Sequence, residues 1–92
     1  MDVKLTSIPV YADGIKTRNE DFGMLLVSKR TPILTLNEDS TAIWQKLDGS
    51  RNVFTIISEL KNEYDCPENE LETTVLSFLD SCRKLGLIEF QQ

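Results

Sequence analysis

Histidine is missing from this chain of 92 residues, and cysteine occurs only twice. Without histidine, the commonest general base and the commonest metal ligand are both absent. The two cysteines, Cys66 and Cys82, are spaced unlike any zinc-binding motif. Glycine-rich phosphate loops, H-E-x-x-H and G-x-S-x-G are also absent. We therefore expect a protein that is not an enzyme, with no catalytic residue, no metal site and no cofactor.

Neither cysteine has the surroundings of a nucleophile. Cys66 precedes Pro67 at an expected helix start, a position that can lower the pKa of a thiol, but no histidine is available to activate it. Cys82 falls on the apolar stripe of an expected helix, where a thiol behaves as a small hydrophobic side chain. Both residues are therefore expected to be structural.

The chain also lacks a long apolar run and a surplus of basic residues. No stretch approaches the roughly 18 apolar residues that span a bilayer, and the first residues lack the pattern of a signal peptide. Ten basic and fifteen acidic residues give a net charge of −5, which disfavours nucleic acids and anionic membranes as partners. We expect one domain, located in the cytoplasm.

The amino-terminal third contains the expected strands. Residues 1–13 combine apolar positions with Pro9 and end at the turn signal Asp13-Gly14, which predicts an N-terminal arm or an edge segment. Residues 15–19 and 23–28 predict two strands. Residues 29–32 predict a turn into a third strand, residues 33–36. These segments together predict a three-stranded antiparallel sheet.

Three helices are expected to follow the strands. The first covers residues 38–48, with Asn37 as N-cap and Gly49 as its stop, and the second runs from after Asn52 to about Tyr64. The third begins at Pro67 and ends at Gly86. Its apolar stripe consists of Leu71, Val75, Phe78, Leu79, Cys82 and Leu85. Residues 87–90 are expected to pack back on the core as an apolar tail.

This order of elements predicts an α+β fold that resembles a winged helix-turn-helix, with a three-stranded antiparallel sheet followed by three helices. Such folds often bind DNA, and a winged-helix transcription regulator is therefore an alternative hypothesis. The candidate recognition helix, however, carries acidic residues along its length and basic residues only at its end. An acidic helix is repelled by phosphates, so DNA binding is the less favoured function.

Several short motifs occur along the chain in a fixed order: Leu36-Asn37, Ile43-Trp44, Leu47-Asp48-Gly49, Ile56-Ile57, Tyr64-Asp65, Phe78-Leu79 and Leu85-Gly86-Leu87-Ile88. In this order and spacing they resemble the PqqD family, which is named after the peptide chaperone of pyrroloquinoline quinone biosynthesis. The resemblance covers about residues 14–90, and the expected family domain is residues 14–92. The chain departs from the family in its N-terminal arm and at Cys82, where a larger aliphatic residue is common.

The resemblance implies a non-catalytic role in the biosynthesis of ribosomally made, modified peptides. It implies that the leader of a precursor peptide is added as an antiparallel strand to the third strand, against the third helix. The implied second partner is a tailoring enzyme, either a radical S-adenosylmethionine maturase or a leader peptidase with its cyclase. A monomer and a dimer are both compatible with the sequence.

The expected binding site combines the third strand with one flank of the third helix. Side chains alternate between the faces of a strand, so either Ile33 with Thr35 or Leu34 with Leu36 faces the core. One helix flank carries Leu76 and Arg83, and the other carries small polar residues; either flank could line the groove. The candidate peptide-binding residues are Ile33, Leu34, Thr35, Leu36, Thr74, Leu76, Ser77, Phe78, Ser81 and Arg83. The expected core residues are Ile43, Trp44, Leu47, Ile57, Leu60, Phe78 and Leu79.

Overall fold

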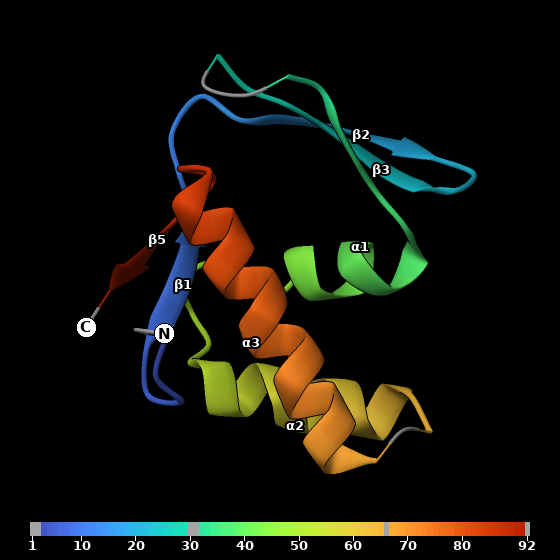
Figure 1. Ribbon diagram of the computed structural model, residues 1–92, viewed down its shortest axis with the longest axis vertical. Coiled ribbons are helices and arrows are strands. Elements are labelled where there is room, and N and C mark those ends of the chain that lie inside the picture. The colour runs from blue at the N-terminus through green and yellow to red at the C-terminus, as the bar shows by residue number, and fades with distance from the viewer. Residues whose placement is uncertain (1–2, 30–31, 66, 92) are drawn as a thin grey trace.

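The computed structural model describes residues 3–29, 32–65 and 67–91, which form two small sheets and three helices (Figure 1). Arg30 and Thr31 of the predicted turn, and Cys66 at the expected start of the third helix, lie outside the described residues. The elements in chain order are β1 (Ile8–Tyr11), β2 (Lys16–Glu20), β3 (Gly23–Val27), β4 (Leu34–Leu36), α1 (Glu38–Trp44), α2 (Val53–Glu63), α3 (Glu68–Lys84) and β5 (Ile88–Gln91).

The three-stranded sheet has the order β2-β3-β4, and both pairs are antiparallel. Leu36 pairs with Met24 and Leu34 pairs with Leu26. Leu36 is buried and Leu34 is half-buried, whereas Ile33 is 65% exposed. The sequence left open which pair of residues in this strand faces the core. Leu34 and Leu36 do so, because they share the inner face with the buried side chains of β3. The predicted α+β fold with this sheet and three helices is confirmed.

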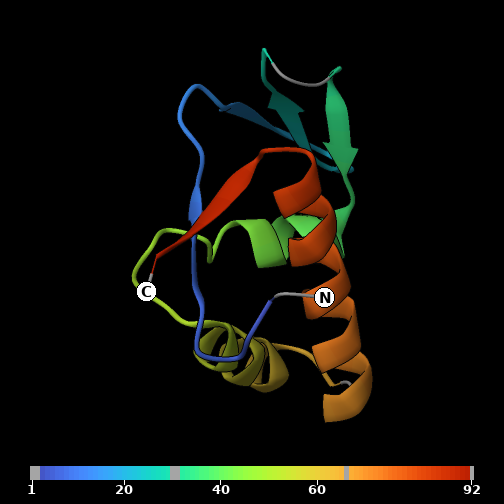
Figure 2. The ribbon, with the colours of Figure 1, turned by 60° about the vertical axis from the view of Figure 1, so that its left-hand side comes forward.

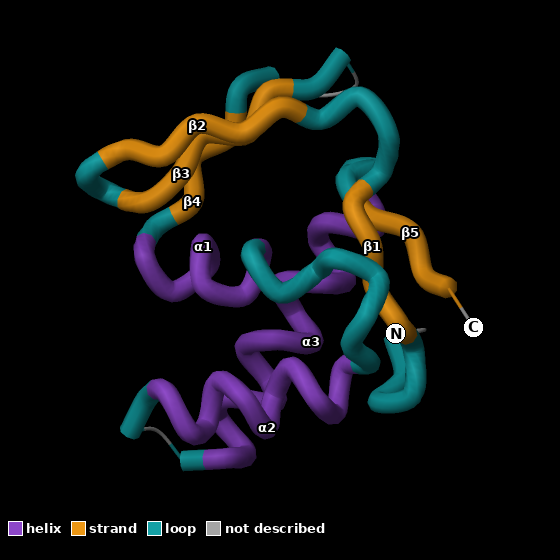
Figure 3. The backbone as a smooth tube through the Cα atoms, turned by 180° about the vertical axis from the view of Figure 1, so that it is seen from behind, coloured by secondary structure: helices purple, strands orange, loops and turns teal. Residues whose placement is uncertain are grey.

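A second sheet joins the two ends of the chain. β1 pairs with β5 in antiparallel register, from Ile8 opposite Gln91 to Tyr11 opposite Ile88, and Figure 3 shows the two strands side by side. The sequence predicted only an apolar tail here. Leu87 and Ile88 are indeed buried, but the pairing was missed because it joins segments that are distant along the chain.

Asparagine side chains begin the first two helices as predicted. The Asn37 Oδ1 atom accepts a hydrogen bond from the backbone N–H of Ser40 at 2.8 Å, and the Asn52 Oδ1 atom accepts one from Thr55 at 2.8 Å. These bonds satisfy N–H groups that have no partner inside a helix. Each helix therefore starts at a position set by its local sequence.

The first helix is shorter than predicted, because α1 ends at Trp44 instead of Asp48. Beyond Trp44 the chain tightens, and the Leu47 N–H bonds to the Trp44 carbonyl at 3.1 Å, three residues back. This turn still buries Leu47 completely. The apolar pattern predicted the burial of Leu47 correctly and its helical conformation wrongly.

The core lies where the helices meet the inner face of the sheet and the β1–β5 pair. The Tyr11 ring lies 4.8 Å from the Trp44 ring between centroids, and the Tyr11 hydroxyl donates a hydrogen bond to the Trp44 carbonyl at 2.6 Å. Of the predicted core, Phe78 is only half-buried, and Leu85 on the predicted stripe is 43% exposed, because both lie at the margin of the buried face of α3. The buried members are Ile43, Trp44, Leu47, Ile57, Leu60 and Leu79.

Asp48 follows α1 and makes the stability of the protein sensitive to acid. Its carboxylate accepts hydrogen bonds from the Ser50 hydroxyl at 2.6 Å, the Ser50 N–H at 3.1 Å and the Arg51 guanidinium at 2.9 Å. These contacts, with the Ser50 hydroxyl contributing most, lower the pKa of Asp48 from 3.8 to about 2. Because the folded state then binds fewer protons than the unfolded state, this stabilisation is present above about pH 4 and is lost as the pH falls through about 2.

We therefore expect Asp48→Asn to be less stable than the wild type near neutral pH and to lose less stability between about pH 4 and pH 2. Urea unfolding at several pH values measures the difference. Some acid sensitivity should remain, since ion pairs also lower the pKa values of Glu59 and Asp80. Asp13→Asn, at an exposed position, is the control. Equal pH slopes for the wild type and Asp48→Asn would contradict the prediction.

Candidate functional site

The strand β4 forms one edge of the three-stranded sheet. It pairs with β3 on one side, and within the described residues no strand lies on its other side (Figure 2). In an antiparallel strand, alternate residues direct their N–H and C=O groups toward each side. The free side of β4 therefore presents backbone groups with which an extended peptide can pair.

The opposite edge of the sheet, β2, is less suited to pairing. All residues from Lys16 to Asn19 are exposed, and Arg18 forms an ion pair with Glu20 at 2.8 Å. Charged side chains along an edge discourage the addition of another strand. The β4 edge, with its inward-facing leucines, is the better candidate.

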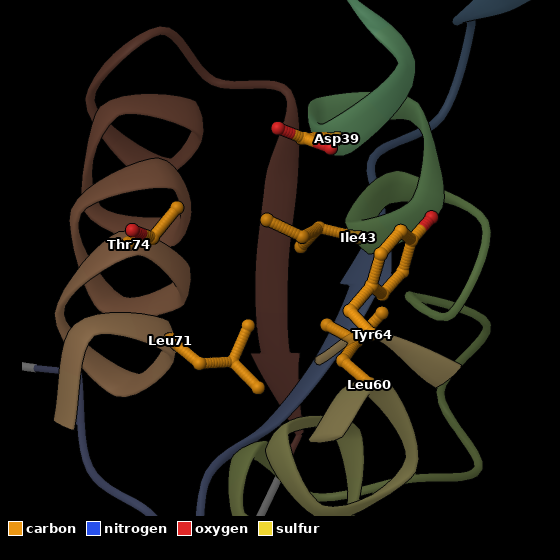
Figure 4. A pocket seen from close by; sticks show the side chains of 6 residues that line it. All are labelled: Asp39, Ile43, Leu60, Tyr64, Leu71 and Thr74. Atoms are coloured by element: carbon orange, nitrogen blue, oxygen red, sulfur yellow. The ribbon is translucent and has the colours of Figure 1, made fainter. Parts of the chain in front are cut away.

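A hollow of about 160 Å³ opens between the three helices (Figure 4). Its walls are mainly apolar, and the lining residues that carry polar groups are Asp39, Tyr64 and Thr74. A cavity of about 150 Å³ holds a benzene ring, so the hollow is large enough for one ring-sized side chain. The lining residues are Asp39, Ile43, Leu60, Tyr64, Leu71 and Thr74.

The hollow and the edge of β4 are neighbours along the chain. β4 ends at Leu36, Asn37 caps α1, and Asp39 in the first turn of α1 lines the hollow. Only two residues separate Leu36 from Asp39, so the end of β4 lies close to the hollow.

The two flanks of α3 lie in different surroundings. Thr74 is exposed and projects into the hollow, and Ser77 and Ser81 are exposed as well. Leu76 is half-buried and packs against the core, and it is not among the residues that line the hollow. Of the two flanks left open by the sequence, only the Thr74 flank is adjacent to the hollow.

The basic residues at the end of α3 are engaged within their own helix. The Arg83 guanidinium contacts the Asp80 carboxylate at 2.9 Å, and the Lys84 ammonium contacts it at 3.1 Å. Arg83 is one of the candidate peptide-binding residues. Its contact with Asp80 means that a peptide carboxylate would have to compete with an existing ion pair.

Sequence analysis missed most of the hollow. Ile43, Leu60 and Leu71 were assigned to the core or to the apolar stripe, and they are indeed buried. No motif marks their second role, because the hollow exists only where three helices converge. Tyr64, where the second helix was predicted to end, is 41% exposed, and nothing in its sequence position distinguishes it from an ordinary surface aromatic residue.

The described residues offer apolar contact and backbone pairing more than reactive groups. Burial raises the pKa of the Cys82 thiol to about 12, so this thiol is protonated at neutral pH. The described residues contain no cluster of three acidic, cysteine or histidine side chains arranged to hold a metal ion. Within the same residues, none of the helices is long and apolar enough to cross a membrane.

The fold and the edge define a class of small α+β domain, in which a short antiparallel sheet leaves one strand open beside helices. The family described as coenzyme PQQ synthesis protein D (PqqD) matches residues 23–88. Because this match covers most of the chain, the protein belongs to the PqqD family. The resemblance recognised in the sequence is thereby confirmed.

Two solved structures share the fold. "TbiB1 in Complex with the TbiA(beta) Leader Peptide" has a TM-score of 0.78 and 18% identity, over 87% of this chain and 94% of that chain. "Lasso peptide synthetase B1 complexed with the leader peptide" has a TM-score of 0.78 and 19% identity, over 89% of this chain and 98% of that chain. No curated protein matches the chain.

Proposed function

We propose that this protein binds the leader region of a ribosomally synthesised precursor peptide and delivers it to a modifying enzyme. The leader is held as an additional strand on β4, and one of its side chains enters the hollow. The protein itself performs no chemistry. The observation that carries this proposal is the free edge of β4, which leads into an apolar hollow between the helices.

Family and fold support the same function. The chain belongs to the PqqD family, and both related structures are complexes with a leader peptide. The surface chemistry agrees, since a net charge of −5 and the engaged Arg83 and Lys84 leave little attraction for a nucleic acid. Of the two functions suggested by the sequence, the structure favours peptide binding over DNA binding.

Two kinds of interaction contribute to binding, one to affinity and the other to register. Hydrogen bonds to the backbone of residues 33–36 give affinity for any extended segment, because they do not depend on side chains. Register comes from the side chain in the hollow, which selects one position of the peptide. From the sequence-derived site, we retain residues 33–36 and the Thr74 flank of α3 with Ser77 and Ser81. Leu76 and Phe78 are both half-buried and pack against the core.

The benefit of binding without catalysis is effective concentration. When one protein holds the leader and also contacts the enzyme, the meeting of enzyme and peptide core becomes intramolecular. The enzyme is a radical S-adenosylmethionine maturase or a leader peptidase acting with a cyclase. Either enzyme requires the same property of this protein, a leader held in one register.

Backbone methylation of the peptide tests strand addition. We expect N-methylation of the leader to weaken binding about tenfold at each residue whose N–H points to β4, because a buried carbonyl then loses its donor. Methylation at the intervening residues, whose N–H points away, is the matched control and should have a much smaller effect. Fluorescence anisotropy with labelled leader peptides measures the affinities.

Amide hydrogen exchange supplies the second measurement. The amides of residues 34–36 that point away from β3 should exchange more slowly when the leader is bound. If methylation at successive residues weakens binding equally and the β4 amides gain no protection, strand addition is refuted. Absence of any binding would refute the proposed function itself.

A further inference from the structure

Acidic residues lie in the segments that line the hollow. Asp39 lines the hollow itself, and Glu38 precedes it in the first turn of α1. Asp65 directly follows the lining residue Tyr64, and Glu70 directly precedes the lining residue Leu71. All four side chains are exposed, and among the described residues none of the four forms an ion pair. The segments that line the hollow therefore carry negative charge that the fold itself does not neutralise.

The basic residues on or beside these helices leave this charge largely uncompensated. Lys46, just beyond α1, contacts Glu59 at 3.1 Å and Glu63 at 2.7 Å, so its charge is already shared between two carboxylates. Between Arg51 and Arg83 the sequence contains one basic residue, Lys61, which lies in the last turn of α2. The mouth of the hollow thus remains net negative.

The direction in which a peptide is added to β4 determines which of its residues lie at the mouth of the hollow. β4 runs from Leu34 toward Leu36 and then into α1. A peptide antiparallel to β4 runs the other way, so the residues that precede its paired segment lie over α1 and the hollow. Its following residues lie toward Lys29, which is exposed beyond the end of β3.

We propose that the hollow and its acidic mouth bind the segment of the leader that precedes the paired strand, with an apolar side chain inside the hollow and a lysine or arginine at the mouth. This inference rests on the proposed function and specifies the chemistry of its ligand. The apolar walls accommodate the first side chain, and the unpaired carboxylates attract the second. Together they favour one direction of the peptide on β4, because a reversed peptide would bring its basic residue to the Lys29 end.

The expected contribution of the basic residue is modest and depends on salt. An exposed ion pair changes an affinity by roughly two- to fivefold. Screening should remove this contribution at high salt, since the Debye length falls from about 30 Å at 0.01 M to about 3 Å at 1 M. The apolar contact in the hollow should persist under both conditions.

Selection from a library of short random peptides displayed on phage tests the inference without knowledge of the natural leader. The wild type is compared with an Asp39→Lys, Glu70→Lys double variant and with Glu89→Lys, an exposed charge reversal on β5. Peptides selected on the wild type and on Glu89→Lys should carry lysine or arginine before an apolar, β-branched segment. Peptides selected on the double variant should lose this preference.

One selected peptide is then synthesised with glutamine in place of its basic residue. We expect a two- to fivefold weaker affinity at about 0.01 M salt and little difference at about 1 M. Circular dichroism verifies the fold of each variant, and Asp39→Asn with Glu70→Gln replaces the charge reversal if that variant does not fold. The inference is overturned if peptides that protect the β4 amides show no basic preference, or if the double variant retains it. Binding of the selected peptides without protection of β4 would refute strand addition and this inference with it, whereas the proposed function itself is refuted only by absence of leader binding.

Discussion

Gly23→Ala is expected to destabilise the protein by about 3 kcal/mol or more, through two effects at one residue. Gly23 has φ +146°, a conformation that side chains rarely adopt, which costs about 1–3 kcal/mol. A Cβ atom would also collide with the Leu36 carbonyl oxygen and lie 2.8 Å from the Asn37 carbonyl carbon. These backbone atoms cannot move without displacing the junction of β4 and α1, and such overpacking costs about 1–3 kcal/mol.

Gly14→Ala separates the two effects. Gly14 also has a positive φ, +82°, but a Cβ atom there would meet nothing within 4 Å. We expect a loss of about 1–2 kcal/mol from backbone strain alone. Urea unfolding measures the free energy of unfolding of both variants. Equal losses would mean that the junction of β4 and α1 accommodates the Cβ atom at little cost. Because Gly23 touches the junction that leads from β4 into the hollow, only Gly23→Ala should also weaken peptide binding in the folded fraction.

Thr74→Trp is expected to weaken leader binding by roughly thirtyfold or more while the protein stays folded. Thr74 projects into the hollow from α3 (Figure 4), and an indole ring there would occupy the space proposed for the leader side chain. Loss of a buried anchor in an interface costs about 2 kcal/mol or more. Thr74 is exposed, so the larger side chain should not disturb the core. Titration with labelled leader peptide measures the change.

Thr73→Trp is the matched control, because the neighbouring threonine is exposed and does not line the hollow. Its hydroxyl donates a hydrogen bond to the Asn69 carbonyl at 2.9 Å, and loss of this exposed bond should change stability little. We expect near wild-type affinity. Equal weakening by both variants would indicate a general disturbance of α3, and unchanged affinity of Thr74→Trp would exclude the hollow as the anchor site.

The binding test also bears on the acidic mouth of the hollow. If Thr74→Trp removes most of the affinity, the remaining weak binding should still respond to salt when the peptide carries its basic residue. Hydrophobic contact and ion pairing would then be separable contributions at one end of the groove. The backbone pairing along β4 would be common to all of these peptides.

Local chemistry in the sequence specified many of the elements. Asn37 and Asn52 were recognised as N-caps because their side chains satisfy N–H groups only a few residues away. The alternating and helical apolar patterns gave the three-stranded sheet, the three helices and most of the core. The absence of histidine predicted a protein that is not an enzyme, and the acidic balance disfavoured nucleic acids and anionic membranes as partners.

The tertiary structure decided the features that depend on distant segments. The sequence alone could not reveal the pairing of β1 with β5, since each strand is recognisable only opposite the other. It left open which side chains of β4 face inward, and the pairing of Leu34 and Leu36 with β3 resolved this. The hollow beside Thr74 arises from the convergence of three helices whose lining residues look like ordinary core positions one at a time. Helix caps and apolar periodicity depend on residues that lie close together in the sequence. A binding surface instead depends on the distances between helices and strands in the folded protein.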